Sequence, residues 1–103
     1  MIAETKSLTC KLTTRELQER KRTVIADLKA ALLERVEIAN GMRYKFPGAD
    51  RDIEKLVSFI KTERMCCGFF TFTLIVSEDD QPVWLELTGP EGVKDFIREE
   101  VGF

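Results

Sequence analysis

Three cysteines and one glutamate are the side chains in this sequence best suited to chemistry. Cys66 and Cys67 are adjacent, Glu63 precedes them by one helical turn, and Cys10 lies near the start of the chain. The sequence contains no histidine, which excludes Ser-His and Cys-His catalysis and histidine metal sites. Thiolates without histidine favour zinc, monovalent copper and thiophilic ions such as mercury or arsenite. The sequence therefore predicts a soft metal site with Cys10, Cys66 and Cys67 as ligands and Glu63 as an auxiliary ligand or orienting carboxylate.

The same thiols have two other interpretations. A disulfide within the adjacent pair is disfavoured, because consecutive Cα atoms are about 3.8 Å apart and disulfides need about 4.4 to 6.8 Å. A thiol oxidoreductase would need a lowered thiol pKa, whereas a helix C-terminus and a nearby glutamate are expected to raise it. Cysteine also acts as a small hydrophobe in protein cores, and Cys10 lies between Leu8 and Leu12. Redox chemistry and structural filling therefore stay open beside metal binding.

The first half of the chain has clear local patterns. Residues 7–12 alternate between apolar and polar, which is typical of a short strand. Thr13 and Glu16 form a capping box that begins a helix over about 14–33. Asn40-Gly41 separates two alternating runs and predicts a hairpin with a type I′ turn.

The second half repeats this order of helix and hairpin. A helix begins at Asp50 and ends near the cysteine pair, with Gly68 in the left-handed position that ends many helices. Residues 69–76 and 83–88 are rich in β-branched and aromatic side chains and predict a second hairpin. A final helix is expected after Pro90.

The resulting order, β-α-β-β-α-β-β-α, predicts a single α+β domain over residues 1–103. Its first six elements match a ferredoxin-like β-α-β-β-α-β core, to which a hairpin strand and a C-terminal helix are added. In that core the first and fourth strands are antiparallel neighbours. Cys10, near the exit of the first strand, is therefore expected to approach Cys66 and Cys67. Glu63 shares a helical face with the pair.

Composition limits the partners and the compartment. The net charge is −2, from 16 basic and 18 acidic side chains, which disfavours nucleic acid because its binders carry a basic face. No secretory signal or membrane-length apolar run is visible. Three free cysteines then suit a reducing cytoplasm. No motif beyond the thiols supports an enzyme.

The sheet face turned away from the helices is a second candidate surface. By alternation it should present an apolar patch among polar side chains: Thr9, Lys11, Arg43, Lys45, Phe69, Thr71, Thr73, Ile75, Trp84 and Glu86. An isolated chain does not usually expose such a patch, so either the last helix or a second copy should cover it. A homodimeric ligand- or protein-binding module with structural cysteines is therefore the alternative function.

Three segments resemble a family of small bacterial proteins of unestablished function. CKLT, ERMCCGFFTF and VWLELTGPEGVKDFI are similar to that family's C-x-L-T start, E-R-x-C-C-P-F segment and L-T-G-P ending. Gly68 stands where the family pattern has proline. The resemblance implies that Cys10, Glu63, Arg64, Cys66 and Cys67 belong to one motif, and it implies no activity.

Overall fold

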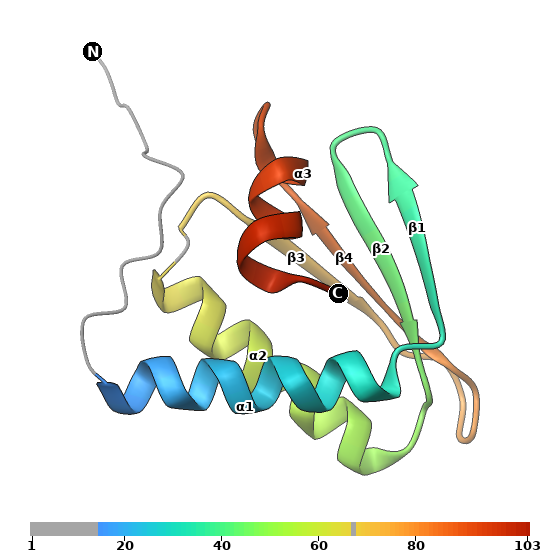
Figure 1. Ribbon diagram of the computed structural model, residues 1–103. Helices are drawn as coiled ribbons and strands as arrows, with labels where there is room; N and C mark the ends of the chain where they lie inside the picture. Colours follow the sequence, from blue (N-terminus) through green and yellow to red (C-terminus); the bar gives the residue numbers. More distant parts are fainter. Residues whose placement is uncertain (1–14, 67) are drawn as a thin grey trace.

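The described part of the chain folds as three helices and a four-stranded antiparallel sheet (Figure 1). The computed structural model describes residues 15–66 and 68–103, apart from the side chains of Leu17, Cys66 and Glu100. The elements are α1 (Arg15–Ala31), β1 (Glu34–Ile38), β2 (Gly41–Phe46), α2 (Asp50–Cys66), β3 (Thr71–Ile75), β4 (Val83–Thr88) and α3 (Val93–Phe96), which continues as a π-helical segment, Ile97–Val101. The predicted strand at 7–12 lies outside the described residues.

The strand order corrects the ferredoxin-like prediction. The sheet runs β1-β2-β4-β3, so β4 pairs with β2 on one side and with β3 on the other. A ferredoxin-like sheet would place the N-terminal strand between β2 and β3. The predicted pairing of β3 with β4 in the second hairpin is confirmed, but β4 lies inside the sheet, between β2 and β3. The physical reason is burial: Val83, Leu85 and Leu87, on the core face of β4, are each 0% exposed, and neighbouring strands on both sides help to exclude water from that face.

The first hairpin also differs in detail from the prediction. Ile38 pairs with Gly41, so the loop consists of Ala39 and Asn40, and neither Asn40 nor Gly41 has the positive φ of a type I′ turn. Gly41 is required for another reason, because a Cβ there would lie 1.8 Å from the Leu87 carbonyl oxygen of β4. A loop shifted by one residue changes each cross-strand partner by two positions. The faces of the strands therefore stay as predicted.

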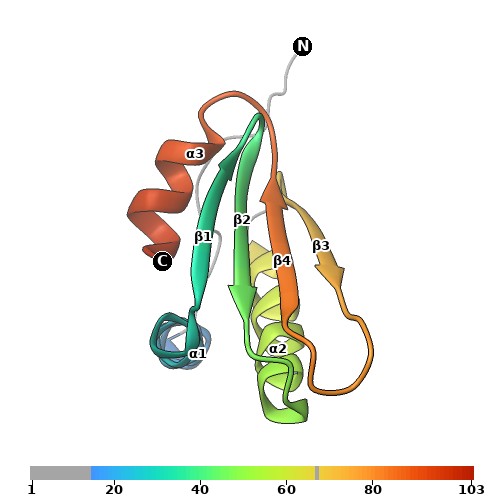
Figure 2. The ribbon, with the colours of Figure 1, turned by 90° about the vertical axis from the view of Figure 1, so that its right-hand side faces the viewer.

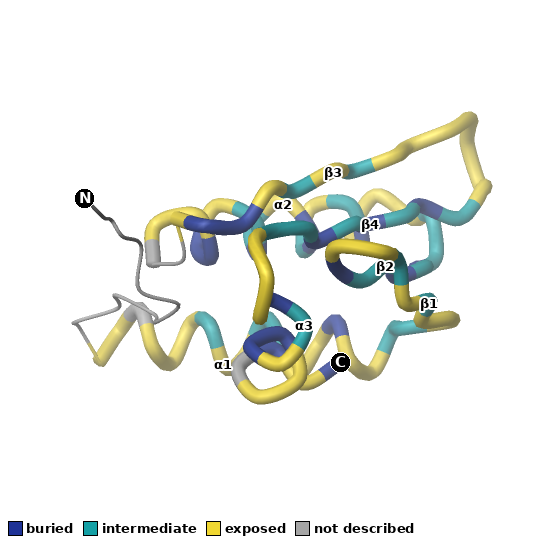
Figure 3. The backbone as a smooth tube through the Cα atoms, turned by 90° about the horizontal axis from the view of Figure 1, so that it is seen from above, coloured by how far each residue is buried: buried dark blue, intermediate teal, exposed yellow. Residues whose placement is uncertain are grey.

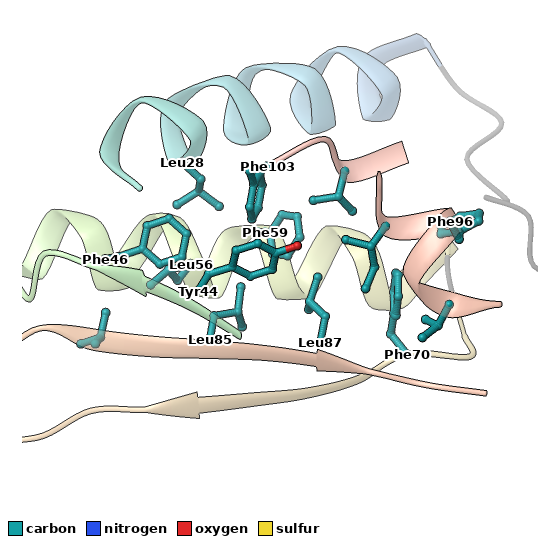
Figure 4. Close-up of a cluster of buried hydrophobic side chains, with 14 of the residues drawn as sticks. Leu28, Tyr44, Phe46, Leu56, Phe59, Phe70, Leu85, Leu87, Phe96 and Phe103 are labelled. Atoms are coloured by element: carbon teal, nitrogen blue, oxygen red, sulfur yellow. The ribbon is translucent and has the colours of Figure 1, made fainter. Parts of the chain in front are cut away.

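The core lies between the sheet and the helices. Tyr44 and Phe46 of β2 meet Leu28 of α1 and Leu56 and Phe59 of α2 (Figure 4), and all five are at most 1% exposed. The apolar stripe of α1 also includes Val24, Ile25 and Ala31, which pack against this cluster at helical spacing. A view from above shows the buried segments turned toward the space between the sheet and the helices (Figure 3).

The helices leave the opposite face of the sheet uncovered within the described residues. Figure 2 looks onto this outer face, with α2 behind the strands and α3 beside β1. Val93, Phe96 and Ile97 are buried in the same core as α1 and α2, so the last helix does not cover the outer face. In the described part of the chain, no helix has the length and apolar character needed to cross a membrane.

Candidate functional site

The cysteines occupy the end of α2 and the region before α1. Cys66 is the last residue of α2, but its side chain, together with Cys10 and Cys67, lies outside the described residues. The ferredoxin-like order was the reason for expecting Cys10 beside the pair, and that order is wrong. The convergence of the three thiols therefore stays a prediction.

Glu63 is buried at the contact between α1 and α2. Its side chain is 0% exposed, and its carboxylate lies 3.6 Å from the ammonium group of Lys21 on α1. Thr62, beside it, is 1% exposed and donates its hydroxyl to the carbonyl oxygen of Ser58 one turn earlier. A buried carboxylate needs a compensating positive charge, and the long Lys21 side chain supplies one from the neighbouring helix. Glu63 thus joins the cysteine-bearing helix to α1.

The residues that flank the cysteine pair are exposed. Arg64 is exposed on one side of the pair and Gly68 on the other, and Met65 is 56% exposed. The φ of Gly68 depends on residue 67, which lies outside the described residues, so the left-handed position stays a prediction; a Cβ added at Gly68 would meet none of the described residues within 4 Å. Among the described residues, the surroundings of this position therefore leave room for a side chain.

The chain then enters the core at two phenylalanines. Phe69 and Phe70 are each 8% exposed, and their rings lie 4.9 and 5.8 Å from the ring of Phe96 in α3. α2 and this aromatic cluster therefore anchor the described residues on either side of position 67. Phe69 had been expected on the outer face, but β3 begins only at Thr71, so alternation does not extend to residue 69.

The outer face of the sheet carries the other predicted residues. Trp84 of β4 lies between two cations, with the guanidinium carbon of Arg43 and the Nζ of Lys45 each 5.7 Å from its ring centre. Arg43 also binds Glu86, with Nη2 2.7 Å from the carboxylate. Ile75 is 42% exposed on β3. The outer face therefore presents a partly exposed tryptophan surrounded by charged side chains that form ion pairs.

Metal-ligating side chains do not gather elsewhere in the described structure. Across residues 15–66 and 68–103, no group of three or more cysteine, aspartate and glutamate side chains lies close enough to hold a metal ion. Because none of the three thiol groups is among the described side chains, this observation does not test the three-cysteine site.

Comparisons with protein-family models, curated proteins and solved structures give no significant match to this chain. Functional proposals consequently depend on its own residues and their geometry.

Proposed function

We propose that the protein binds a thiophilic metal or metalloid ion, such as zinc, monovalent copper, arsenite or mercury, through Cys10, Cys66 and Cys67. The observation that carries this proposal is the exposure around the pair: Arg64, Met65 and Gly68 are all exposed. Core-filling cysteines would be expected within a buried stretch of chain. Exposed neighbours on both sides instead favour access of an ion from solvent.

The end of a helix also suits a bound cation. The C-terminus of α2 carries a partial negative charge from its last carbonyl groups, and Cys66 is the final residue of that helix. A metal ion supplies the positive charge that stabilises thiolates in such a place. The same surroundings disfavour an activated catalytic cysteine, because catalytic thiols usually lie near positive charge.

Glu63 fits the orienting role better than direct ligation. Its carboxylate is fully buried and lies 3.6 Å from Lys21, so turning it toward a metal ion would disrupt a buried ion pair. Holding α2 against α1, it would fix the direction in which the last turn presents the cysteines. Outer partners of this kind typically change metal affinity by about 10- to 100-fold.

The test is elemental analysis of protein purified without chelator, together with thiol counts on native and unfolded protein. We expect about one bound ion per chain, as in ordinary closed thiolate sites, and thiols that react only after chelation. Cys66→Ser and Cys67→Ser should each weaken binding by more than about 100-fold, since even outer partners contribute about 10- to 100-fold. Met65→Leu is the matched control, because it removes only the neighbouring thioether.

The proposal fails if the protein binds none of zinc, monovalent copper, arsenite and mercury and its thiols react independently of one another. Retained binding in the Cys10→Ser variant, with loss in the other two, would restrict the ligand set to Cys66 and Cys67.

A second candidate function is a homodimeric binding module that uses the outer face of the sheet. The observation that favours it is Trp84, which lies on a face without helix cover in the described residues and is flanked by Arg43 and Lys45. The face also carries Glu34 and Glu86, so it presents both signs of charge. A two-fold interface joins one patch to its own copy, and mixed charge permits such self-pairing.

Light scattering across a concentration series tests the dimer. We expect a dimer mass that Trp84→Ser shifts to the monomer, because tryptophan anchors commonly dominate interfaces. Leu33→Ser is the control, since Leu33 is 57% exposed but lies between α1 and β1 and not on this face. A monomer mass for the wild-type protein at submillimolar concentration would rule this function out.

A further inference from the structure

A pocket on the helix side of the sheet shares no residue with the cysteine segment or the outer face. It has a volume of about 270 Å³ and lies between the β1–β2 hairpin and the C-terminal helical segment. Its rim is charged and consists of Arg35, Glu37, Lys94 and Arg98. Drug-sized ligands occupy about 300 to 1,000 Å³, so this pocket suits a smaller molecule.

The floor of the pocket is apolar except for one hydroxyl group. Met42, Ile97 and Phe103 line it together with Tyr44, and Tyr44 is 0% exposed. The Tyr44 hydroxyl has no hydrogen-bond partner among the described residues. A buried hydroxyl without a partner loses its hydration without compensation. Its burial is therefore unfavourable unless a ligand or a water molecule binds to it.

Two observations fix the position of that hydroxyl. The ring of Tyr44 meets the ring of Phe103 edge to face at 4.9 Å, and in Figure 4 the hydroxyl points away from Phe46. The oxygen is closed to solvent although the residue borders the pocket. It thus lies beneath the lining of the pocket, and a ligand must displace side chains of that lining to reach it. Burial raises the pKa of Tyr44 to about 12, so the hydroxyl remains a donor at neutral pH.

The rim supplies a positive charge beside this donor. Lys94 lies 2.7 Å from the Glu37 carboxylate and Arg98 lies 2.9 Å from that of Asp95. Arg35 instead donates to a main-chain oxygen of Phe103 at 3.3 Å and has no side-chain carboxylate partner in the described part of the chain. Arg35 is the direct cross-strand partner of Tyr44. A guanidinium and a phenol therefore face the same side of the sheet at one position of the register.

We propose that this pocket binds a small organic carboxylate with a single ring or short chain as its apolar part. The carboxylate accepts a hydrogen bond from the Tyr44 hydroxyl and is balanced by Arg35. The apolar part of the ligand packs on Met42 and Ile97. Charged acceptors form the stronger class of hydrogen bonds, which suits a site with one buried donor and one guanidinium.

The test uses protein labelled at the methionine methyl carbons and titrated with benzoate, cyclohexanecarboxylate and hexanoate. Met42 lines the pocket, whereas Met65 is 56% exposed at the end of α2 and serves as an internal control. We expect at least one of these acids to shift the Met42 signal saturably and to leave the Met65 signal unchanged. Benzamide, which lacks the charge, and inorganic phosphate, which lacks the apolar part, should bind at least about tenfold more weakly.

Two substitutions separate binding from packing. Tyr44→Phe keeps the ring that contacts Phe103, and Arg35→Gln removes the charge, so each should weaken the bound acid by at least about tenfold. Arg51→Gln, at an exposed arginine in the first turn of α2, should leave affinity unchanged. The free Tyr44→Phe protein should be as stable as the wild type or more stable, since it lacks the buried hydroxyl.

Three results would overturn the proposal. One is the absence of any saturable Met42 shift with all three acids. Another is binding that survives Tyr44→Phe and Arg35→Gln without change. The third is a wild-type protein that binds no acid and a Tyr44→Phe variant that is less stable, which would assign the hydroxyl to a buried water molecule.

Discussion

Replacing Phe103 with alanine should be among the most destabilising single changes in the C-terminal segment. The side chain is 4% exposed, and its ring contacts those of Tyr44, Phe46 and Phe59 at 4.9, 6.1 and 5.6 Å. Burying a phenylalanine contributes about 1.5 to 3 kcal/mol by transfer from water, and the remaining cavity increases the loss to about 3 to 5 kcal/mol. A domain of this size has about 5 to 15 kcal/mol in total.

Urea unfolding followed by circular dichroism measures this loss. The midpoint should fall while the slope with denaturant stays constant, because the change alters stability rather than the surface exposed on unfolding. Leu33→Ala is the control: Leu33 is 57% exposed, and surface substitutions usually stay within about 0.5 kcal/mol. A loss below about 1.5 kcal/mol for Phe103→Ala would show that Phe103 does not close the core, and the described floor of the pocket would then be wrong.

Three further predictions concern ionisable groups. The single tyrosine should ionise near pH 12, because burial raises the pKa of Tyr44 from 10.0 to about 12, and phenolate absorbance measures this. The stability of the fold should fall as the pH rises above about 10, where only the unfolded chain loses the proton. Unfolding of the Tyr44→Phe variant, which lacks this ionisation, checks the second effect. Lys94 lowers the pKa of Glu37 by its hydrogen bond and charge, so any stability that Glu37 contributes is present above pH 4.5 and is lost as the pH falls through the lowered pKa. In acid, Glu37→Gln and the wild type should therefore have the same stability toward unfolding. A difference that persists there would contradict this role of Lys94. Lys21→Met removes a cationic partner of the buried Glu63 carboxylate and should lower the free energy of unfolding by about 3 kcal/mol. Adding Glu63→Gln to the same chain should restore most of that loss. A double-mutant cycle that shows no coupling between the two positions would contradict a buried ion pair.

Patterns local in sequence predicted which residues face the core. Alternation placed Arg43, Lys45 and Trp84 on the outer face, and the burial of β2 and β4 agrees with this. These predictions hold because the two-residue period of a strand depends only on backbone geometry. Alternation does not show where a strand begins, and Phe69 was misplaced because its backbone precedes the paired part of β3.

The order of strands and the pocket could not be read in this way. The alternation in residues 83–88 is compatible with one partner strand or two, and the complete burial that favours two partners is known only from the structure. The pocket depends on Arg35 standing opposite Tyr44 and on a π-helical segment that brings Ile97 and Phe103 over them. The π-helical hydrogen bonding, with Gly102 donating to the Ile97 carbonyl oxygen, has no sequence signature as strong as that of a capping box.

The interior position of β4 has a consequence for how the protein is made. β2 and β3 do not pair with each other, and β4 joins them. A nascent chain that has left the ribosome only as far as β3 therefore has a hairpin and a separate strand with no shared edge. The sheet can close only after residues 83–88 emerge, so folding waits for nearly the whole of this sequence. Until then β2 and β3 each lack the strand that pairs with them, and their free edges can pair with other chains, as expected for sheets with long-range pairing.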